Sequence, residues 1–274
     1  MKNFILCGLM ATLLQFLAPL ALAAPKAELW PRWQAHDAGS AIKVDHTAWQ
    51  HLLNKYLDTA HQSGINRFQY QKITAADRQT LSYYLQSLGK IAVSRLNQQE
   101  QKAYWINLYN ALTVKVILDH YPVQSIRDID ISPGFFSDGP WGKKLVKIEG
   151  VSISLDDIEH RILRPIWQDN RVHYAVNCAS LGCPNLQPEA FTAANTDMLL
   201  DKGAREYINH SHGVKFEDGK LLLSSIYDWF REDFGGSEQG VRNHLQKYSS
   251  PALSEKISKF NSRANYFYDW SLNE

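Results

Sequence analysis

The chain opens with an apolar run, Phe4 to Leu22, that follows the basic residue Lys2. Ala21-Leu22-Ala23 has the small-x-small form that signal peptidase cuts after. A retained membrane anchor is the alternative, but Pro19, the small residues at the end of the run and a marginal length argue against it. We therefore expect residues 1–23 to be a cleaved signal peptide and the protein to be exported, either to a periplasm or as a secreted protein.

After a lead-in over residues 24–44, apolar residues recur at spacings of three and four, which is typical of amphipathic helices. Capping residues sharpen two of these segments, since Thr74 precedes one and Asn97 precedes the longest. The pattern predicts helices over about 45–63, 74–89 and 98–120.

The middle of the chain changes to short apolar stretches around turn dipeptides. Glu149-Gly150 and Asp218-Gly219 each predict a β-hairpin. Strands are also expected over 171–177 and 265–270. A short helix over 155–163 should be stopped by Pro165. Further helices are expected after about Pro188 to about Asn209, over 227–230 and over 238–248. The mixture predicts an α+β fold: one domain over 45–274, with a long central helix packed on a small antiparallel or mixed sheet.

Charge narrows the possible partners. Lys2 is the only Lys or Arg among residues 1–23, so its removal takes 29 basic residues to 28, equal to the 28 Asp and Glu. A neutral chain without a basic stripe argues against nucleic acid, and no later segment is apolar enough for a membrane span. No Gly-rich phosphate loop or zinc-binding helix motif indicates a cofactor. The expected partner is an unidentified small molecule or peptide.

Polar residues on the long helix are the first candidates for a site. Glu100, Asn107 and Asn110 share one face with apolar neighbours around them. Buried amides and carboxylates are costly unless they are hydrogen-bonded. They either tie down neighbouring backbone or line a polar site that orients a catalytic group.

Two cysteines, Cys178 and Cys183, follow the predicted strand that carries His173 and Asn177. On a strand His173 and Asn177 would share a face, so a dyad of His173 with Cys178 requires the strand to end at Asn177. In an exported protein the pair suggests a disulfide, although so small a loop contributes only about 2 kcal/mol. A structural disulfide, a redox-active pair and a nucleophilic cysteine all stay open, and a metal site is least favoured.

His160 and Arg164 are four residues apart on a predicted helix and could bind an anion together, although an ordinary solvated face is the simpler interpretation. Two aromatic segments with carboxylates, 227–234 and 268–273, have the composition of core packing.

Several motifs together resemble the domain-of-unknown-function family 547, over about residues 95–235 and a C-terminal motif. They are Ala103-Tyr-Trp-Ile-Asn-Leu-Tyr-Asn-Ala111, Ser154-Leu-Asp-Asp-Ile-Glu-His-Arg-Ile-Leu-Arg164, Arg171-Val-His-Tyr-Ala-Val-Asn-Cys178, Cys183-Pro184 and Tyr268-Asp-Trp-Ser-Leu-Asn273.

The resemblance implies that both Asn107 and Asn110, the His160–Arg164 and His173–Asn177 pairs and both cysteines occupy positions characteristic of the family. Gly182 departs from the family pattern, which usually has Ser before the second cysteine. Plant relatives keep the cysteine pair without a secretory context, which implies more than a structural disulfide. A weaker fold-level similarity is to papain- or transglutaminase-type enzymes.

The leading hypothesis from the sequence is a thiol-dependent hydrolase or acyl transferase. Cys178 would be the nucleophile, His173 or His160 its base, and Asn107, Asn110 and Asn177 would orient the base or an oxyanion. One alternative is a binding module that holds a small anionic ligand through His160 and Arg164, with a Cys178–Cys183 disulfide shaping the rim of the pocket. Glu100, Arg164 and Cys183 are the candidate ligand-binding residues. The other alternative is a thiol redox protein.

Overall fold

The computed structural model describes residues 25–134 and 138–274, so the signal-peptide prediction for 1–23 lies outside the described residues. Helices and small sheets together confirm the α+β class. The α-helices are α1 (Thr47–Tyr56), α2 (Ala75–Gly89), α3 (Gln98–His120), α4 (Arg164–Trp167), α5 (Thr196–Ile208), α6 (Ile226–Trp229), α7 (Glu238–Tyr248) and α8 (Pro251–Lys259). Short 3₁₀ turns are η1 (Pro31–Gln34), η2 (Tyr70–Lys72), η3 (Val93–Arg95), η4 (Ile126–Asp128) and η6 (Asn170–Tyr174), and η5 (Asp157–Leu163) is a π-helix.

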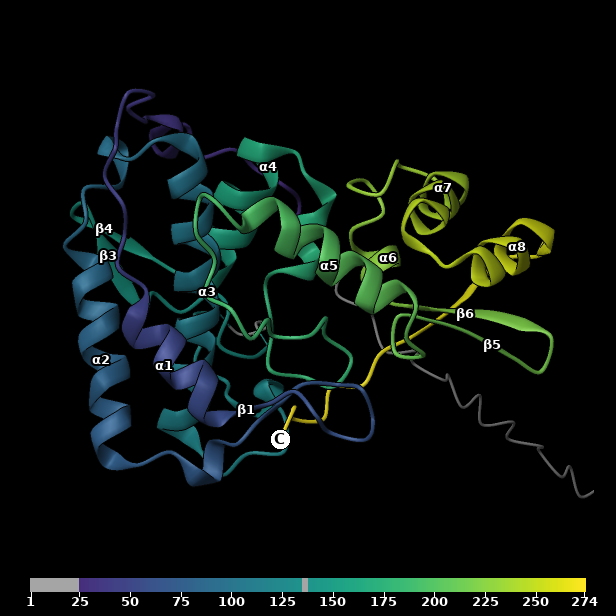
Figure 1. Cartoon of the computed structure of the whole chain (residues 1–274), viewed down its shortest axis with the longest axis horizontal. Coiled ribbons are helices and arrows are strands. Elements are labelled where there is room, and N and C mark those ends of the chain that lie inside the picture. The colour runs from purple at the N-terminus through teal and green to yellow at the C-terminus, as the bar shows by residue number, and fades with distance from the viewer. Residues whose placement is uncertain (1–24, 135–137) are drawn as a thin grey trace, which may run out of the picture.

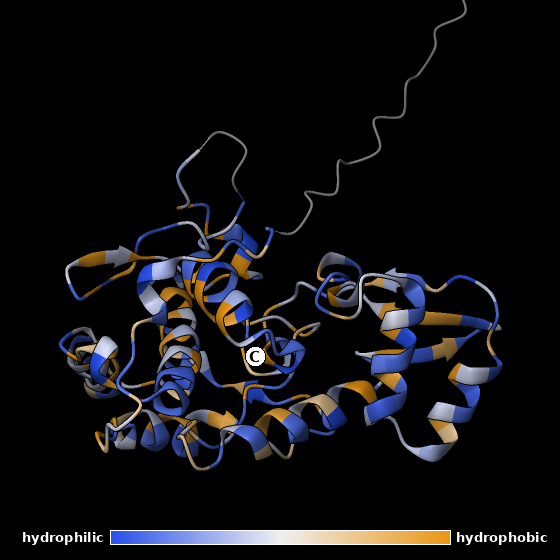
Figure 2. Ribbon diagram, turned by 90° about the horizontal axis from the view of Figure 1, so that it is seen from above, coloured by the Kyte–Doolittle hydropathy of each residue, from blue (hydrophilic) through white to orange (hydrophobic). Residues whose placement is uncertain are grey.

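Three small sheets accompany the helices. Two are antiparallel pairs, β1 (Leu57–Asp58) with β2 (Arg67–Phe68) and β3 (Val146–Ile148) with β4 (Val151–Ile153). The third is mixed, because β6 (Lys220–Ser224) pairs antiparallel with β5 (Val214–Glu217) and parallel with β7 (Asn265–Phe267). Helices α1 to α3 lie at one end of the molecule and the β5–β6 hairpin with α7 and α8 at the other, with α5 between them (Figures 1 and 2).

Helix α3 is the centre of the larger hydrophobic core. Most of its residues from Glu100 to Leu118 are buried, which explains why its apolar residues are not confined to one stripe. The predicted cap holds, since Asn97 Oδ1 accepts a hydrogen bond from Glu100 N at 2.9 Å. Thr74 caps α2 in the same way. A second core lies among α5, α7 and the mixed sheet.

Four local predictions were wrong. The first helix ends at Tyr56, where the chain enters β1, and Pro165 does not stop the helix after Ser154, because α4 continues through it. Residues 171–177 do not form a strand: Asn170–Tyr174 is a 3₁₀ turn, which Asp169 starts by accepting a hydrogen bond from Arg171 N. The segment 265–270 is a strand only to Phe267, and helix α8 was not predicted.

The described part of the chain holds no helix that is long and apolar enough to span a membrane.

Candidate functional site

Cys178 and Cys183 face each other as free thiols. Their sulfurs lie 3.0 Å apart, whereas a disulfide bond is about 2.05 Å long. Cys178 N also donates a hydrogen bond to Cys183 Sγ at 3.0 Å. Cys183 is buried and Cys178 is only half-buried. The pair therefore combines a half-buried cysteine with a buried one, and the disulfide suggested by the spacing is not formed in this structure.

Two hydroxyl groups complete the surroundings of the Cys178 sulfur. Ser180 Oγ and Tyr268 Oη each lie 3.1 Å from it, and 3.0 Å from each other. The Cys183 thiol, followed by these hydroxyls, hydrogen-bonds the sulfur and holds the pKa of Cys178 below its usual value, against the opposing effect of burial. Burial and the Cys178 charge raise the pKa of Cys183 well above its usual value. Cys178 is therefore the better nucleophile of the two.

The loop that presents Cys178 is held by amide side chains. Asn110 Oδ1 accepts a hydrogen bond from Asn177 N at 2.8 Å, and Asn110 Nδ2 donates to Ala175 O at 2.8 Å. Asn177 in turn donates to Pro184 O and accepts from Ala179 N. Ala179 has a φ of 60°, in the left-handed region that side chains other than glycine rarely adopt. These bonds turn the chain sharply just after Cys178.

A segment near the C-terminus covers the other side of this loop. Leu181 N and Gly182 N donate to the carbonyl groups of Ser271 and Asp269, both at 2.8 Å. A Cβ on Gly182 would lie 2.8 Å from Asp269 N and 3.0 Å from its carbonyl oxygen. Glycine therefore permits the close approach that places Tyr268 on the thiols, which gives the departure from the family pattern a physical reason.

Aromatic rings surround the thiols on this side. Trp229 and Trp270 pack on Tyr268 with ring centroids 4.8 and 4.6 Å away, and Trp141 meets Trp270 at 5.8 Å. All four rings are half-buried. They form an aromatic rim, defined here as Trp141, Trp229, Tyr268 and Trp270, which reaches the Cys178 sulfur through the Tyr268 hydroxyl.

A second group of polar residues, which we term the histidine cluster, consists of Glu159, His160, Arg164, His173 and Asp233. His173 Nε2 and Arg164 Nε both donate to Asp233 Oδ2, at 2.7 and 2.6 Å. Arg164 also donates to His160 Nδ1 at 3.0 Å. Phe230, next in sequence to Trp229 of the aromatic rim, stacks on His173 at 4.3 Å.

The pKa values of the two histidines in the cluster are shifted in opposite directions. Burial opposes protonation of His173, but the hydrogen bond to Asp233 and the charge of Glu159 raise its pKa. Burial, with the nearby positive charges, lowers the pKa of His160 to about 4. The partners of His173 thus favour its protonated form, whereas the surroundings of His160 favour its neutral form.

His173 and His160, which the sequence suggested as the base for Cys178, do not hydrogen-bond its sulfur. Among the described residues no histidine hydrogen-bonds Cys178 or Cys183, because His173 and His160 are held by Asp233 and Arg164. His173 lies on a 3₁₀ turn and not on a strand, so the face-sharing argument and the strand-borne histidine of papain-like enzymes do not apply. The solvated face expected for His160 and Arg164 was also wrong, since they are 6% and 5% exposed.

The remaining predicted residues bind backbone. Asn107 forms a reciprocal pair with Phe191, donating to its carbonyl at 2.7 Å and accepting from its N–H at 3.0 Å. Glu100 accepts from Val44 N at 2.7 Å near the start of α3. Both arrangements match the backbone-anchoring alternative, and neither places the side chain among the partners of the thiols.

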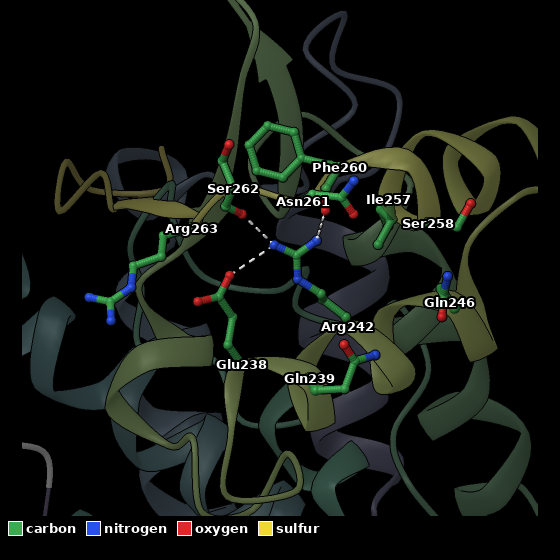
Figure 3. A pocket seen from close by; sticks show the side chains of 10 residues that line it. All are labelled: Glu238, Gln239, Arg242, Gln246, Ile257, Ser258, Phe260, Asn261, Ser262 and Arg263. Carbon is green, nitrogen blue, oxygen red and sulfur yellow. Dashed lines mark hydrogen bonds and ion pairs between the residues drawn. The ribbon is translucent and has the colours of Figure 1, made fainter.

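A separate groove between α7 and α8 has a structural explanation. Arg242 donates to Glu238 Oε1 at 2.8 Å and to the carbonyl groups of Phe260 and Ser262, as Figure 3 shows. These bonds join the end of α8 to α7. None of the residues predicted for the site lines this groove.

Comparisons with known proteins concern the part of the chain that holds both cysteines and most of the histidine cluster. Residues 93–208 match a family model. That family is described as "Protein of unknown function, DUF547". The match covers fewer than half of the residues, and it confirms the resemblance inferred from the motifs. No curated protein and no solved structure matches the chain.

The DUF547 match contains both cysteines and four members of the histidine cluster. Asp233, Trp229 and Tyr268 lie beyond it, and we had assigned their segments to core packing. Nothing in the sequence around Trp229 or Tyr268 indicates that these side chains contact residues more than fifty positions away. Ser180 was also missed, although its place between the two cysteines could have indicated it.

Replacing Tyr268 with phenylalanine should raise the pKa of Cys178, because one of the hydrogen bonds to its sulfur is lost. We expect the pH midpoint of iodoacetamide alkylation to move upward and the rate at pH 7 to fall. Tyr83→Phe is the matched control, since Tyr83 is 63% exposed on α2. An unchanged midpoint in Tyr268→Phe would show that the hydroxyl does not tune this thiol.

Proposed function

We propose that the protein carries out thiol–disulfide exchange, with Cys178 as the attacking thiol and Cys183 as the resolving thiol. The observation that carries the proposal is the pair of unbonded sulfurs 3.0 Å apart, one half-buried with a lowered pKa and one buried with a raised pKa. A dithiol used in exchange needs this asymmetry, because one thiolate attacks the substrate disulfide first and the other thiol resolves the mixed disulfide afterwards.

Thiol–disulfide exchange here needs only the substrate disulfide and the two cysteines of the protein. The Cys178 thiolate attacks one sulfur of a substrate disulfide, and the other half leaves as a thiolate that takes up a proton. Cys183 loses its proton and attacks Cys178 Sγ, which releases the second half as a thiol and leaves a Cys178–Cys183 disulfide. The substrate disulfide is reduced by two electrons and the protein dithiol is oxidised by two, and a dithiol reverses both steps.

Acyl transfer, the leading hypothesis from the sequence, is less well supported. It needs a base at the sulfur and a proton donor for the leaving group. The hydrogen-bond partners of Cys178 are a thiol and two hydroxyls, and the histidines are engaged elsewhere. Export, which we propose from residues 1–23, would place the pair where disulfides form readily.

A redox titration tests the proposal. The folded protein is equilibrated with graded ratios of reduced and oxidised dithiothreitol, quenched with acid and alkylated, and its free thiols are counted by mass spectrometry. With Cys7 replaced by serine, we expect a reversible transition between two free thiols and none, with the far-ultraviolet circular dichroism unchanged. A bond that resists reduction until urea unfolds the chain would favour the binding module with a structural disulfide. Failure to form a bond at any ratio would exclude exchange through this pair.

A further inference from the structure

The aromatic rim forms a continuous series of contacts that ends at the reactive sulfur. Tyr268 Oη lies 3.1 Å from Cys178 Sγ, and the Tyr268 ring packs on Trp270 and Trp229 at centroid distances of 4.6 and 4.8 Å. Trp270 in turn contacts Trp229 at 5.6 Å and Trp141 at 5.8 Å. Centroid distances of this size are those of aromatic rings in contact. Each step from Trp141 to the sulfur is therefore a contact between neighbouring groups.

The side chains of this series are those that lose single electrons most readily. A radical formed on an indole passes to a phenol and then to a thiolate, because each is easier to oxidise than the one before it. The rim has them in that order, from half-buried tryptophans through Tyr268 to Cys178. Arg127 lies over the Trp270 ring at 5.4 Å. A cation on a ring face is attracted by the electrons of the ring, so it opposes their removal and keeps a radical from resting on Trp270.

A second aromatic series in the same protein ends differently. Trp30 contacts Trp33 at 5.9 Å, Trp33 contacts Trp105 at 5.1 Å, and Trp105 contacts Tyr104 at 5.1 Å. The Tyr104 hydroxyl donates a hydrogen bond to the carbonyl oxygen of Leu88 at 2.9 Å. A backbone carbonyl does not give an electron to a tyrosyl radical. Aromatic contacts are therefore common to both series, and the thiols at its end distinguish the rim.

We propose that the aromatic rim carries single-electron oxidation from its half-buried tryptophans to the Cys178–Cys183 pair, so that attack by an inorganic radical on the rim ends as a disulfide. This activity uses the same thiols as the proposed function but does not rest on thiol–disulfide exchange, because no substrate disulfide takes part. The co-reactants are the attacking radical and molecular oxygen.

The reaction begins when the attacking radical takes one electron from a rim tryptophan. Tyr268 then gives an electron to the oxidised indole, and its phenolic proton moves along the hydrogen bond to the Cys178 thiolate. The Cys178 thiol returns that proton together with one electron to the tyrosyl oxygen. The tryptophan and Tyr268 are restored, and a thiyl radical remains on Cys178.

Cys183 completes the oxidation, because its sulfur is already 3.0 Å from that of Cys178. It loses its proton to water and bonds to the thiyl radical, which gives a disulfide radical anion. Molecular oxygen takes the extra electron and becomes superoxide, and a Cys178–Cys183 disulfide remains. The thiolate and the thiol together lose two electrons and one proton. One electron is on the product of the attacking radical and the other is on superoxide.

Pulse radiolysis of the reduced protein tests this path. The protein, with Cys7 replaced by serine, is reduced, freed of reductant and given a pulse that produces fewer azide radicals than protein molecules in oxygen-free solution. Azide radicals oxidise tryptophan preferentially, and the indole radical and the disulfide radical anion have distinct absorption bands. We expect the indole radical to decay as the disulfide radical anion forms, at a first-order rate that does not depend on protein concentration. Absence of the disulfide radical anion would overturn the proposal, whatever the redox titration shows for exchange.

Two double variants locate the path. Trp229→Phe with Trp270→Phe removes both indoles that contact Tyr268 and should lower the yield of disulfide radical anion severalfold. Trp30→Phe with Trp167→Phe is the matched control, since it also removes two half-buried tryptophans and leaves the rim intact. The control should keep the wild-type yield. Equal yields in the two double variants would show that azide radicals oxidise the thiolate directly, and the relay would be refuted.

Tyr268→Phe tests the last step and replaces the rim variant if that variant does not fold. It is measured at a pH above the alkylation midpoints of both wild type and variant, so that the thiolate fraction of Cys178 is the same. We expect a longer-lived indole radical and severalfold less disulfide radical anion, because phenylalanine has no hydroxyl to oxidise. An undiminished yield would contradict a path through Tyr268 and with it the proposal.

Discussion

Cys178→Ser is expected to abolish exchange with disulfides, whereas Cys183→Ser should accumulate a stable mixed disulfide on Cys178. The reason is that the two cysteines differ in burial and in the pKa of their thiols. Cys178 is half-buried with a lowered pKa, and Cys183 is buried 3.0 Å behind it. Without Cys183 the first attack still occurs, but nothing releases the bound half. Incubation with cystamine followed by intact-mass measurement should show one added cysteamine on Cys183→Ser and none on Cys178→Ser.

Thermal or urea unfolding of both variants is the control, because each change removes a hydrogen bond inside the loop. Both variants are made with Cys7 also replaced by serine, so that an adduct on Cys183→Ser reports on Cys178 alone. Equal labelling of the two variants would contradict the assignment of roles. Faster labelling of Cys178→Ser would reverse it.

Asn110→Ala should be among the most destabilising single changes in α3. Its amide satisfies Ala175 O and Asn177 N, and all three groups are buried. Alanine would leave both backbone groups without partners, at about 1–3 kcal/mol each. We therefore expect the free energy of unfolding, from urea titration, to fall by about 2–6 kcal/mol. Reactivity of Cys178 should change in parallel, because Asn177 no longer has a fixed position.

Asn243→Ala provides the comparison. Asn243 is exposed on α7 and accepts one hydrogen bond from Gln239 at 2.9 Å, so its loss should cost less than about 0.5 kcal/mol. Similar losses of stability in the two variants would show that the Asn110 bonds contribute little.

Elements governed by local chemistry were predicted well. The caps at Thr74 and Asn97 and the turns at Glu149-Gly150 and Asp218-Gly219 each depend on a few adjacent residues, and the structure has all four. The α+β class followed from these elements. The likeness to papain-type enzymes has no support from a matching solved structure and stays a prediction.

The site was predicted less completely because distant segments form it. The motifs indicated the cysteines and the histidines, but they could not show that Asp233 holds His173 across 60 residues of sequence or that Tyr268 reaches Cys178 across 90. Residues 171–177 resembled a strand by composition. The Asp169 cap and the packing of Val172 and Tyr174 in the interior select a 3₁₀ turn there.

The contact between Tyr268 and Cys178 also makes the reactivity of the thiol conditional on folding. In an unfolded chain the two residues are far apart, and Cys178 has the ordinary thiol pKa of about 8.5. Only the docked segment supplies the hydroxyl that, with Cys183 and Ser180, favours the thiolate. In a newly made chain Cys178 would thus be an unremarkable cysteine, and it would become a nucleophile only when the last strand and the turn after it are in place.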